Sequence, residues 1–287
     1  MGALPAPPQC PAVIATAMGY SLAAGGKRLR PVLCLAGADA VGSDRELAMP
    51  AACALELIHT YSLIHDDLPA MDNDSLRRGR PTLHVVAGDG LAILAGDGLL
   101  TEAFALLARA PASADSGIVA RKLRVIGLIA DAAGAAGMVG GQAIDLACTT
   151  PDPSGRLAPP LDAEGVRLMH ARKTGALIRA SAVAGAIMGG GGETEIGHID
   201  AAAAEFGLAF QIVDDILDVE GVSTLLGKTP GKDAVAGKPT YPALYGLPAA
   251  RQMATECLER AEGSLRTAGL ADSWLMEIGR WIVNRSN

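Results

Sequence analysis

The chain has 287 residues, of which 50% are hydrophobic and only 3% are aromatic. This length can fill a sizeable apolar core, and scarce aromatic residues beside abundant Ala and Leu favour packed helices over a β-sandwich or barrel. The formal net charge of -7 disfavours nucleic acid as a partner, because phosphate backbones are bound by a surplus of Lys and Arg. We therefore expect an all-α fold and no nucleic-acid partner.

The cysteines and the hydropathy pattern bear on the compartment. The five cysteines are Cys10, Cys34, Cys53, Cys148 and Cys257. They form no CxxC pair, which indicates neither a zinc site nor a disulfide framework and fits thiols in a reducing cytoplasm. Arg124 and Asp131 interrupt the most apolar long stretch, 123–141, so no transmembrane segment is predicted. No basic region followed by an apolar core begins the chain, so no signal peptide is predicted.

In chain order, residues 1–11 contain four prolines and are predicted to be a flexible lead-in, followed by one domain over 12–287. Turn-rich breaks at 110–116, 149–160, 189–193 and 220–239 separate stretches of helical periodicity. One helix is expected over 51–67, ended by Pro69, and another over 201–219. Both carry acids at the C-terminal end, where the helix macrodipole disfavours negative charge by about 0.3–1 kcal/mol. Something else must stabilise these acids.

Two acidic clusters end these helices. They are HDDLPAMDND, with Asp66, Asp67, Asp72 and Asp74, and FQIVDDILDVE, with Asp214, Asp215 and Asp218. A solvated helix end could carry one such cluster, but both lie beside apolar sequence, where burying an unpaired charge costs several kcal/mol. Mg²⁺ takes one or two carboxylates together with substrate phosphates. The clusters therefore predict two facing walls of a site for a Mg²⁺-bound diphosphate.

Basic residues are grouped as well. The groups are Lys27, Arg28 and Arg30; Arg77, Arg78 and Arg80; Lys173; and Lys228, Lys232 and Lys238. Any one of them fits a solvated surface. Arginine pairs, however, grip a diphosphate through two parallel hydrogen bonds, and Lys adds a point charge. In a chain of net negative charge, this grouping favours two anion sites.

Seven motifs, taken together and in order, resemble the trans-isoprenyl diphosphate synthases, the farnesyl and geranylgeranyl diphosphate synthase family. They are GGKRLRP (25–31), SLIHDDLPAMDND (62–74), RRGRPT (77–82), GGQAIDL (140–146), KTGALI (173–178), FQIVDDILD (210–218) and LGKTPGKD (226–233). The resemblance covers residues from about 15 to 285. It implies a single-domain prenyltransferase helical bundle around a deep central cavity, usually a homodimer, with Mg²⁺ as cofactor and three ions when substrate is bound.

The resemblance also implies residue roles. The metal ligands would be Asp66, Asp67, Asp72 and Asp214, supported by Asp215 and Asp218, and with Lys173 these are the catalytic residues. The allylic diphosphate would be held by Arg77, Lys173, Thr174, Gln211, Lys228 and Lys238. Isopentenyl diphosphate would be held by Lys27, Arg30, His59 and Arg78. A lone His on a helix is more often structural, and that reading of His59 stays open.

The implied reaction joins isopentenyl diphosphate head to tail to an allylic diphosphate. The allylic carbon–oxygen bond ionises, the isopentenyl double bond attacks the cation, and the released diphosphate takes the proton. Three alternatives stay open. A regulatory prenyl-synthase subunit would lack an aspartate motif, a class I terpene cyclase would not need the GGKRLRP and LRRGRPT motifs, and a helical scaffold would expose its acids without binding Mg²⁺.

Two residues before the first aspartate cluster bear on product length. A tail descending from the metal site would pass side chains about one turn before Asp66. Ser62, four residues before Asp66, is small, whereas Tyr61, five before, is bulky. Together with the two-residue insertion between the aspartates, this pattern resembles bacterial farnesyl diphosphate synthases. We expect farnesyl diphosphate as the main product, with geranylgeranyl diphosphate as the alternative, and an ordinary core position for Tyr61 as the competing interpretation.

Overall fold

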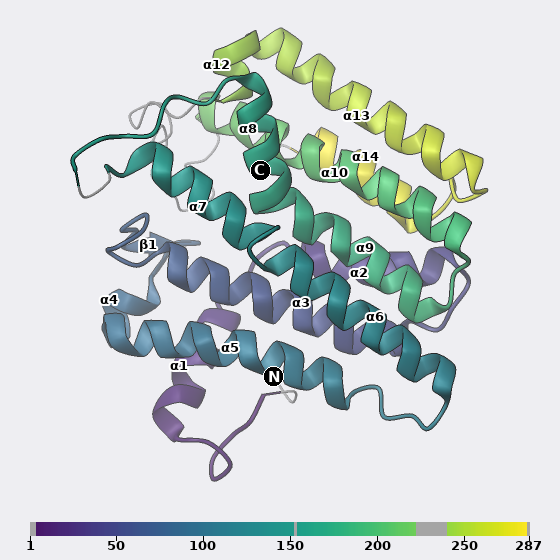
Figure 1. Ribbon diagram of the computed structural model, residues 1–287, viewed down its shortest axis with the longest axis horizontal. Helices are drawn as coiled ribbons and strands as arrows, with labels where there is room; N and C mark the ends of the chain where they lie inside the picture. Colours follow the sequence, from purple (N-terminus) through teal and green to yellow (C-terminus); the bar gives the residue numbers. More distant parts are fainter. Residues whose placement is uncertain (1–3, 152–153, 222–239, 286–287) are drawn as a thin grey trace.

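The fold is a helical bundle, seen in a computed structural model that describes residues 4–151, 154–221 and 240–285 (Figure 1). The α-helices are α1 (Ala12–Leu22), α2 (Leu29–Ala40), α3 (Arg45–Asp66), α4 (Leu83–Ala87), α5 (Asp89–Arg109), α6 (Ser116–Ala133), α7 (Met138–Thr149), α8 (Ala163–His170), α9 (Ala176–Gly189), α10 (Glu193–Val219), α12 (Tyr241–Tyr245), α13 (Leu247–Thr267) and α14 (Trp274–Asn284). A five-residue π-helix, η1 (Ala171–Gly175), joins α8 to α9. The predicted all-α class is confirmed.

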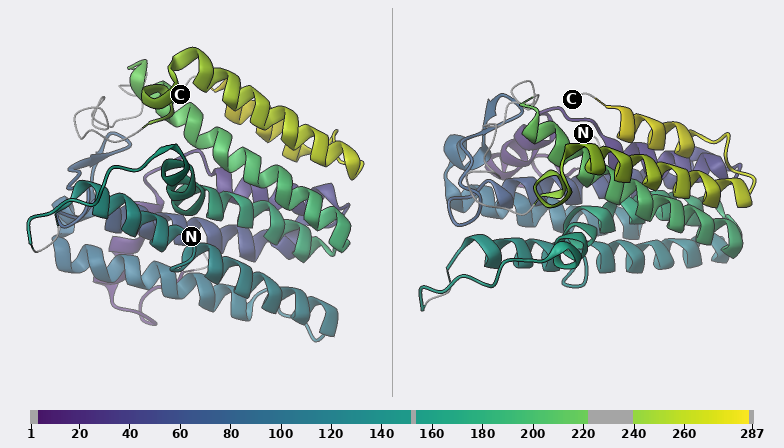
Figure 2. Two further views of the ribbon diagram at one scale, coloured as in Figure 1. Left: turned by 45° about the horizontal axis from the view of Figure 1, so that its top comes forward. Right: turned by 90° about the horizontal axis from the view of Figure 1, so that it is seen from above.

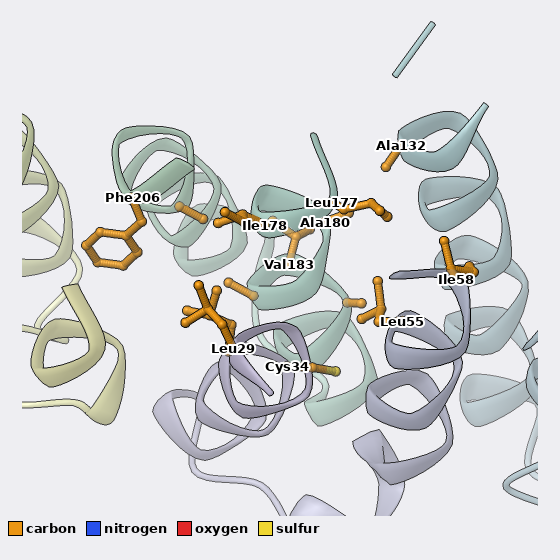
Figure 3. Close-up of a cluster of buried hydrophobic side chains, with 14 of the residues drawn as sticks. Leu29, Cys34, Leu55, Ile58, Ala132, Leu177, Ile178, Ala180, Val183 and Phe206 are labelled. Atoms are coloured by element: carbon orange, nitrogen blue, oxygen red, sulfur yellow. The ribbon is translucent and has the colours of Figure 1, made fainter. Parts of the chain in front are cut away.

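Helix α9 forms the centre of the bundle. It packs against α2, α3, α6 and α10, while α13 covers α10 and α5 covers α3 (Figures 1 and 2). Eleven of its residues, including Leu177 and Ile178, are buried. Figure 3 shows several of them in one buried cluster that also includes Leu29, Leu55 and Phe206 from neighbouring helices. Burial of this kind stabilises by roughly 1.5–3 kcal/mol for each large aliphatic side chain.

Glycines allow α2 and α9 to approach closely. A Cβ built at Gly185 would overlap the carbonyl oxygen of Cys34, and one at Gly37 would overlap that of Ala182. Each helix thus contributes a glycine where the other presents backbone. An Ala at either position would force the helices apart, so this pair fixes α2 against the core.

The observed elements extend two of the predicted ones. Helix α3 begins at Arg45 rather than at 51, because the Asp44 carboxylate accepts from the backbone N–H of Glu46 at 2.9 Å and caps it. Helix α10 begins at Glu193 rather than at 201, where the Glu195 carboxylate accepts from the N–H of Gly192 at 2.8 Å. Both helices end at the predicted acidic clusters.

A short hairpin is the exception to the helical pattern among the described residues. Strands β1 (Leu76–Arg77) and β2 (Arg80–Pro81) pair antiparallel with Arg77 opposite Arg80. The two connecting residues, Arg78 and Gly79, have φ of 55° and 73°. Both positive values are typical of a type I′ turn, the tightest hairpin connection. The hairpin lies at the end of the bundle that also carries α12 (Figure 1).

Four helical stretches are, by length and composition alone, long and apolar enough to cross a membrane. They are Arg45–Asp66, Asp89–Arg109, Ser116–Thr149 and Glu193–Val219, and 33% to 61% of the apolar window in each is buried in the bundle. This differs from the expectation that no stretch would qualify. In α3 and α10, half or more of the window packs against other helices, so the bundle core accounts for much of their apolar sequence.

Candidate active site

The first aspartate wall is a tight loop after α3. The backbone N–H of Asp72 donates to the carbonyl of Asp66 at 2.9 Å, and that of Asp74 donates to the carbonyl of Asp67 at 3.2 Å. Asn73 takes a left-handed φ of 50°, a conformation that Asn tolerates well. The loop thus folds back and brings Asp72 beside Asp66 although five residues separate them in sequence. The predicted spacing of this cluster therefore has a structural basis.

Asp66 lies in an electrostatically mixed environment. Burial raises the pKa of its carboxyl to about 6, the nearby Lys173 opposes that shift, and Asp72 adds to it. A carboxylate that is desolvated and faces another acid would gain from a divalent cation. The influence of Lys173 also shows that the end of α3 faces η1. The two predicted site elements are therefore neighbours.

Asp67 is placed differently from Asp66. It is buried, with 4% of its surface exposed, and Oδ1 accepts from Arg77 Nε at 2.7 Å and pairs with Nη2 at 2.6 Å. Arg77 Nη2 also lies 3.8 Å from Asp74 Oδ2. In this arrangement Asp67 orients Arg77 from the hairpin toward the first wall. Its expected role as a metal ligand stays a proposal.

Lys173 lies in the π-helix η1. Its Nζ lies 2.5 Å from Oδ2 of Asp145, an acid of α7 that is 6% exposed. A Cβ at Gly141 would overlap the backbone of Lys173, so the glycine of the GGQAIDL motif lets α7 approach η1. π-Helical turns occur frequently at functional sites. Here the extra residue in the turn presents Lys173 and Thr174 at the site.

A hydrogen-bonded chain connects η1 to α10. Thr174 Oγ1 donates to Gln211 Oε1 at 3.2 Å, and Gln211 Nε2 donates to Asp215 Oδ1 at 2.9 Å. Asp215 Oδ2 accepts from the backbone N–H of Tyr241 at 3.0 Å. Asp215 is only 4% exposed. Its contacts orient Gln211 and attach α12 to α10, and its expected role in supporting the metal ligands stays a proposal.

Asp214 forms the exposed part of the second wall. Its side chain is 43% exposed, and Oδ1 lies 3.1 Å from Nη2 of Arg285. The Arg285 side chain is 1% exposed, stacks 3.9 Å over the Phe210 ring and also donates to the Phe210 carbonyl. Asp218, one turn further along α10, is partly buried. Arg285 thus holds the partly exposed Asp214 carboxylate in place.

Lys27 links the second wall to the isopentenyl group of residues. Its Nζ lies 5.7 Å from the centroid of the Trp281 ring. Burial and the charge of Arg285 lower the pKa of Lys27, while Asp214 opposes the shift. These influences place Lys27 near the end of α10. The turn before α2 therefore faces the second aspartate wall.

The predicted isopentenyl diphosphate residues are gathered around α3. Burial lowers the pKa of Arg30 to about 10, with Glu56 opposing and Arg78 adding to the shift. Burial and the neighbouring arginines, Arg30 first, hold the pKa of His59 well below its usual range, so His59 is neutral at neutral pH. Arg78 Nη1 donates to the Gly25 carbonyl. The structure therefore brings Arg30, His59 and Arg78 together.

The two residues predicted to limit product length lie on α3 as expected. Tyr61 is 7% exposed, and its ring meets that of His65 edge to face with centroids 5.6 Å apart. A Cβ at Gly96 of α5 would overlap the His65 ring, so the His65 side chain points toward α5. Ser62 Oγ donates to the carbonyl of His59 at 2.9 Å. Tyr61 is thus a buried aromatic of α3 that packs on His65.

Some expectations lie beyond what the structure describes. Lys228, Lys232 and Lys238 fall outside the described residues. In the described parts of the chain, no three His, Cys, Asp or Glu side chains converge to hold a metal by themselves. Two surface hollows of about 480 and 470 Å³ lie elsewhere, beside Arg121 and beside Cys148. Neither is the deep central cavity, which stays an expectation.

Three residues of the site were not predicted from the sequence. Asp145 pairs with Lys173, Arg285 with Asp214, and Glu56 with Arg28. Asp145 lies inside a quoted motif, and Glu56 is an acid within the apolar run 54–58, which is a readable signal. Arg285 has no local pattern, because its partner is 71 positions away.

Comparison with known proteins agrees with this geometry. A family model for polyprenyl synthetase matches residues 11–268. The chain is 50% identical over 255 residues to the heterodimeric geranylgeranyl pyrophosphate synthase large subunit 1 of Arabidopsis thaliana, which covers 89% of this chain and 67% of that protein. It is 46% identical over 282 residues to the farnesyl diphosphate synthase of Geobacillus stearothermophilus, covering 96% and 90%.

A solved structure extends the comparison to the fold. The geranyltransferase of Helicobacter pylori, complexed with magnesium and isoprenyl diphosphate, superposes with a TM-score of 0.79 at 32% identity, covering 94% of this chain and 87% of that one. Fold, site and sequence therefore agree, and the chain belongs to the polyprenyl synthetase family.

Proposed function

We propose that the protein condenses isopentenyl diphosphate head to tail with allylic diphosphates, dimethylallyl and geranyl, in a Mg²⁺-dependent reaction. The observation that carries this proposal is the presence of two cationic groups around two aspartate walls. Arg77 and Lys173 lie beside Asp66, whereas Arg30 and Arg78 lie together near His59, about two turns earlier on α3. Two diphosphate substrates require two such groups.

The residues of the walls fit Mg²⁺. Asp66 and Asp72 are held together by backbone hydrogen bonds, and Asp214 is partly exposed. These are hard oxygen donors, few in number, which suits an ion that keeps waters and binds substrate phosphates. Asp66, Asp72 and Asp214, with Asp67, would hold it. When bound, Mg²⁺ would neutralise negative charge that develops on the departing diphosphate. The related geranyltransferase complexed with magnesium supports this assignment.

The side chains of this chain would perform the remaining steps. Lys173 and Arg77 would hold the allylic diphosphate and stabilise its charge as the carbon–oxygen bond breaks. Thr174 and Gln211, already fixed by their mutual hydrogen bond, would orient the substrate under Lys173. Isopentenyl diphosphate would bind Arg30, Arg78 and Lys27 with its double bond toward the allylic carbon. The released diphosphate is the base that accepts the final proton.

We infer that farnesyl diphosphate is the main product. Tyr61 is buried one and a half turns before Asp66 and packs against His65, which limits the room for a longer tail. Geranylgeranyl diphosphate is the alternative product, since a 50% identical relative is a geranylgeranyl pyrophosphate synthase subunit. The presence of both aspartate motifs and of both cationic groups speaks against a regulatory subunit and against a terpene cyclase.

We further propose that the chain forms a homodimer through α4 and α5. Four large apolar side chains on these adjoining helices, Val85, Val86, Ile93 and Leu94, are 42% to 58% exposed. Large exposed apolar patches usually mark interfaces, and these four side chains lie on two helices that contact each other. One relative is named as heterodimeric, so a different prenyl-synthase chain is the competing partner. The five cysteines, all free thiols, fit the proposed cytoplasmic location.

The experiment is a product assay with labelled isopentenyl diphosphate. The purified protein is incubated with dimethylallyl, geranyl or farnesyl diphosphate, with Mg²⁺ or with a chelator. The proposal expects a fifteen-carbon product from the first two substrates and none with the chelator. Cyclised hydrocarbon without use of the label would indicate a terpene cyclase. If no product formed with any substrate, the proposal would be wrong, and the protein would be a regulatory prenyl-synthase subunit or a helical scaffold.

A further inference from the structure

Glu56 is a buried acid that the reaction above does not use. It lies on α3 three residues before His59, and its side chain is 10% exposed. Its Oε1 accepts from Nη1 of Arg28, whereas Oε2 is buried without a hydrogen-bond partner. A carboxylate in such a place is costly unless it is paired. Core packing alone would favour an apolar residue here, so the acid points to another role.

The partner of Glu56 forms a strained turn. Arg28 precedes α2 with φ 52° and ψ 34°, a left-handed conformation that is unfavourable for a non-glycine residue. Its Nη2 donates to the Leu22 carbonyl at 2.6 Å, and its Nη1 to Glu56. These two contacts attach the turn to α1 and α3. The positions of the residues on either side of Arg28 therefore depend on its ion pair with Glu56.

Those neighbours are the proposed anion ligands. Lys27 directly precedes Arg28, and Arg30 lies in the first turn of α2. Arg78 joins the same turn from the hairpin, because its Nη1 donates to the Gly25 carbonyl and its guanidinium fills the space where Gly26 lacks a Cβ. One turn of chain thus carries or contacts three cations of the isopentenyl site.

Glu56 is also the acid whose charge acts on both Arg30 and Arg78. Burial lowers the pKa of each of these guanidiniums, and Glu56 opposes the shift in both. With Arg28 beside them, three guanidiniums are packed closely and repel one another. A single buried carboxylate offsets part of that repulsion before any substrate is present.

Resting on the proposed function, we propose that Glu56 is a positioning residue for the isopentenyl diphosphate site. Through Arg28 it fixes the turn 25–28 and keeps Arg30 and Arg78 in place before the anion binds. Glu56 itself stays behind the arginines and makes no contact with substrate. Preorganisation of this kind strengthens binding because fewer side chains must be ordered when the substrate arrives.

Neutralising Glu56 changes the affinity for isopentenyl diphosphate in opposite directions, depending on whether Glu56 positions the arginines or only lowers the local positive charge. If Glu56 only diluted the positive charge, its neutralisation would strengthen anion binding. If it positions the arginines, the same neutralisation must weaken binding of isopentenyl diphosphate and spare the allylic diphosphate. A merely structural residue would affect both substrates alike.

The test is steady-state kinetics of the full chain carrying Glu56→Gln, Glu56→Asp or Arg28→Gln. Asp39→Asn is the matched control, because Asp39 pairs with Arg45 on the exposed surface. We expect Glu56→Gln and Arg28→Gln to raise KM for isopentenyl diphosphate about tenfold, the size typical of supporting contacts, with KM for geranyl diphosphate changed less than twofold. Glu56→Asp should recover part of the loss, and Asp39→Asn should match the wild type.

Several outcomes would overturn the proposal. These are an unchanged or lower KM for isopentenyl diphosphate in Glu56→Gln, or equal increases for both substrates. If Glu56→Gln does not fold, an unchanged KM in Arg28→Gln has the same force. Stabilisation of the melting temperature by isopentenyl diphosphate alone provides a readout without turnover. An inactive wild type that isopentenyl diphosphate still stabilises more than Glu56→Gln would refute the proposed function but keep the positioning role.

Discussion

Replacing Tyr61 by Ala tests the proposed limit on product length. Tyr61 lies five residues before Asp66, which at 1.5 Å per residue is about 7.5 Å along α3 from the metal wall. The ring is 7% exposed and packs edge to face on His65. Loss of a buried aromatic costs about 3–5 kcal/mol, of which the ring pair accounts for about 0.5–1.5 kcal/mol. The variant should melt lower and contain new space beside His65.

A longer prenyl tail should occupy that space. We expect Tyr61→Ala to shift the product from fifteen carbons to twenty or more, measured by chromatography of dephosphorylated products made from labelled isopentenyl diphosphate and dimethylallyl diphosphate. Trp274→Ala, which removes an aromatic that is 59% exposed, is the control and should leave the product unchanged. An unchanged product in Tyr61→Ala, or mainly twenty-carbon product from the wild type, would refute the chain-length assignment and leave the prenyltransferase proposal intact.

Two further predictions concern the charge of the first wall and the assembly. Burial raises the Asp66 pKa from 3.8 to about 6, so in metal-free protein the ionised carboxylate opposes folding above about pH 6. This cost fades as the pH falls from about 6 to about 4, where the carboxyl is protonated in the folded protein. Asp66→Asn should therefore raise the melting temperature of metal-free protein at pH 7.5 but not at pH 4; equal effects at both pH values would contradict the assignment. Leu94→Arg on α5 should convert a dimer to a monomer in light scattering, whereas Leu168→Arg, at another exposed position, should not. A monomeric wild type, or a dimer that survives Leu94→Arg, would count against the interface.

Much of the site could be read from the sequence because its chemistry is local. Asp66 and Asp72 belong to one loop, and Lys173 and Thr174 to one turn, so short motifs record them. The helix class followed from composition. The residues at which helices begin were harder to predict. Helix α3 begins at Arg45, six residues before the predicted 51, because Asp44 caps it there and Pro50 lies within its first turns.

Roles that depend on distant partners could not be read. Asp67 and Asp66 look alike in sequence, yet only Asp67 is bound by Arg77 from the hairpin. The pairing of Arg285 with Asp214 and that of Glu56 with Arg28 join separate helices. Hydropathy alone was also insufficient, because the apolar residues of α3 suit either a membrane or a protein core. The packing shows that 61% of the apolar window of α3 is buried inside the bundle.

The central claim is that two aspartate walls from separate helices serve one diphosphate. The most direct measurement is the turnover of Asp214→Ala with geranyl and isopentenyl diphosphate at saturating Mg²⁺. Asp200→Ala is the control, because that acid lies on the same helix and pairs with Arg179 at the surface. The account predicts a fall of at least about 10²-fold for Asp214→Ala, the size expected on removing a group that stabilises developing charge, and normal turnover for the control. Wild-type turnover by Asp214→Ala would contradict the two-walled site.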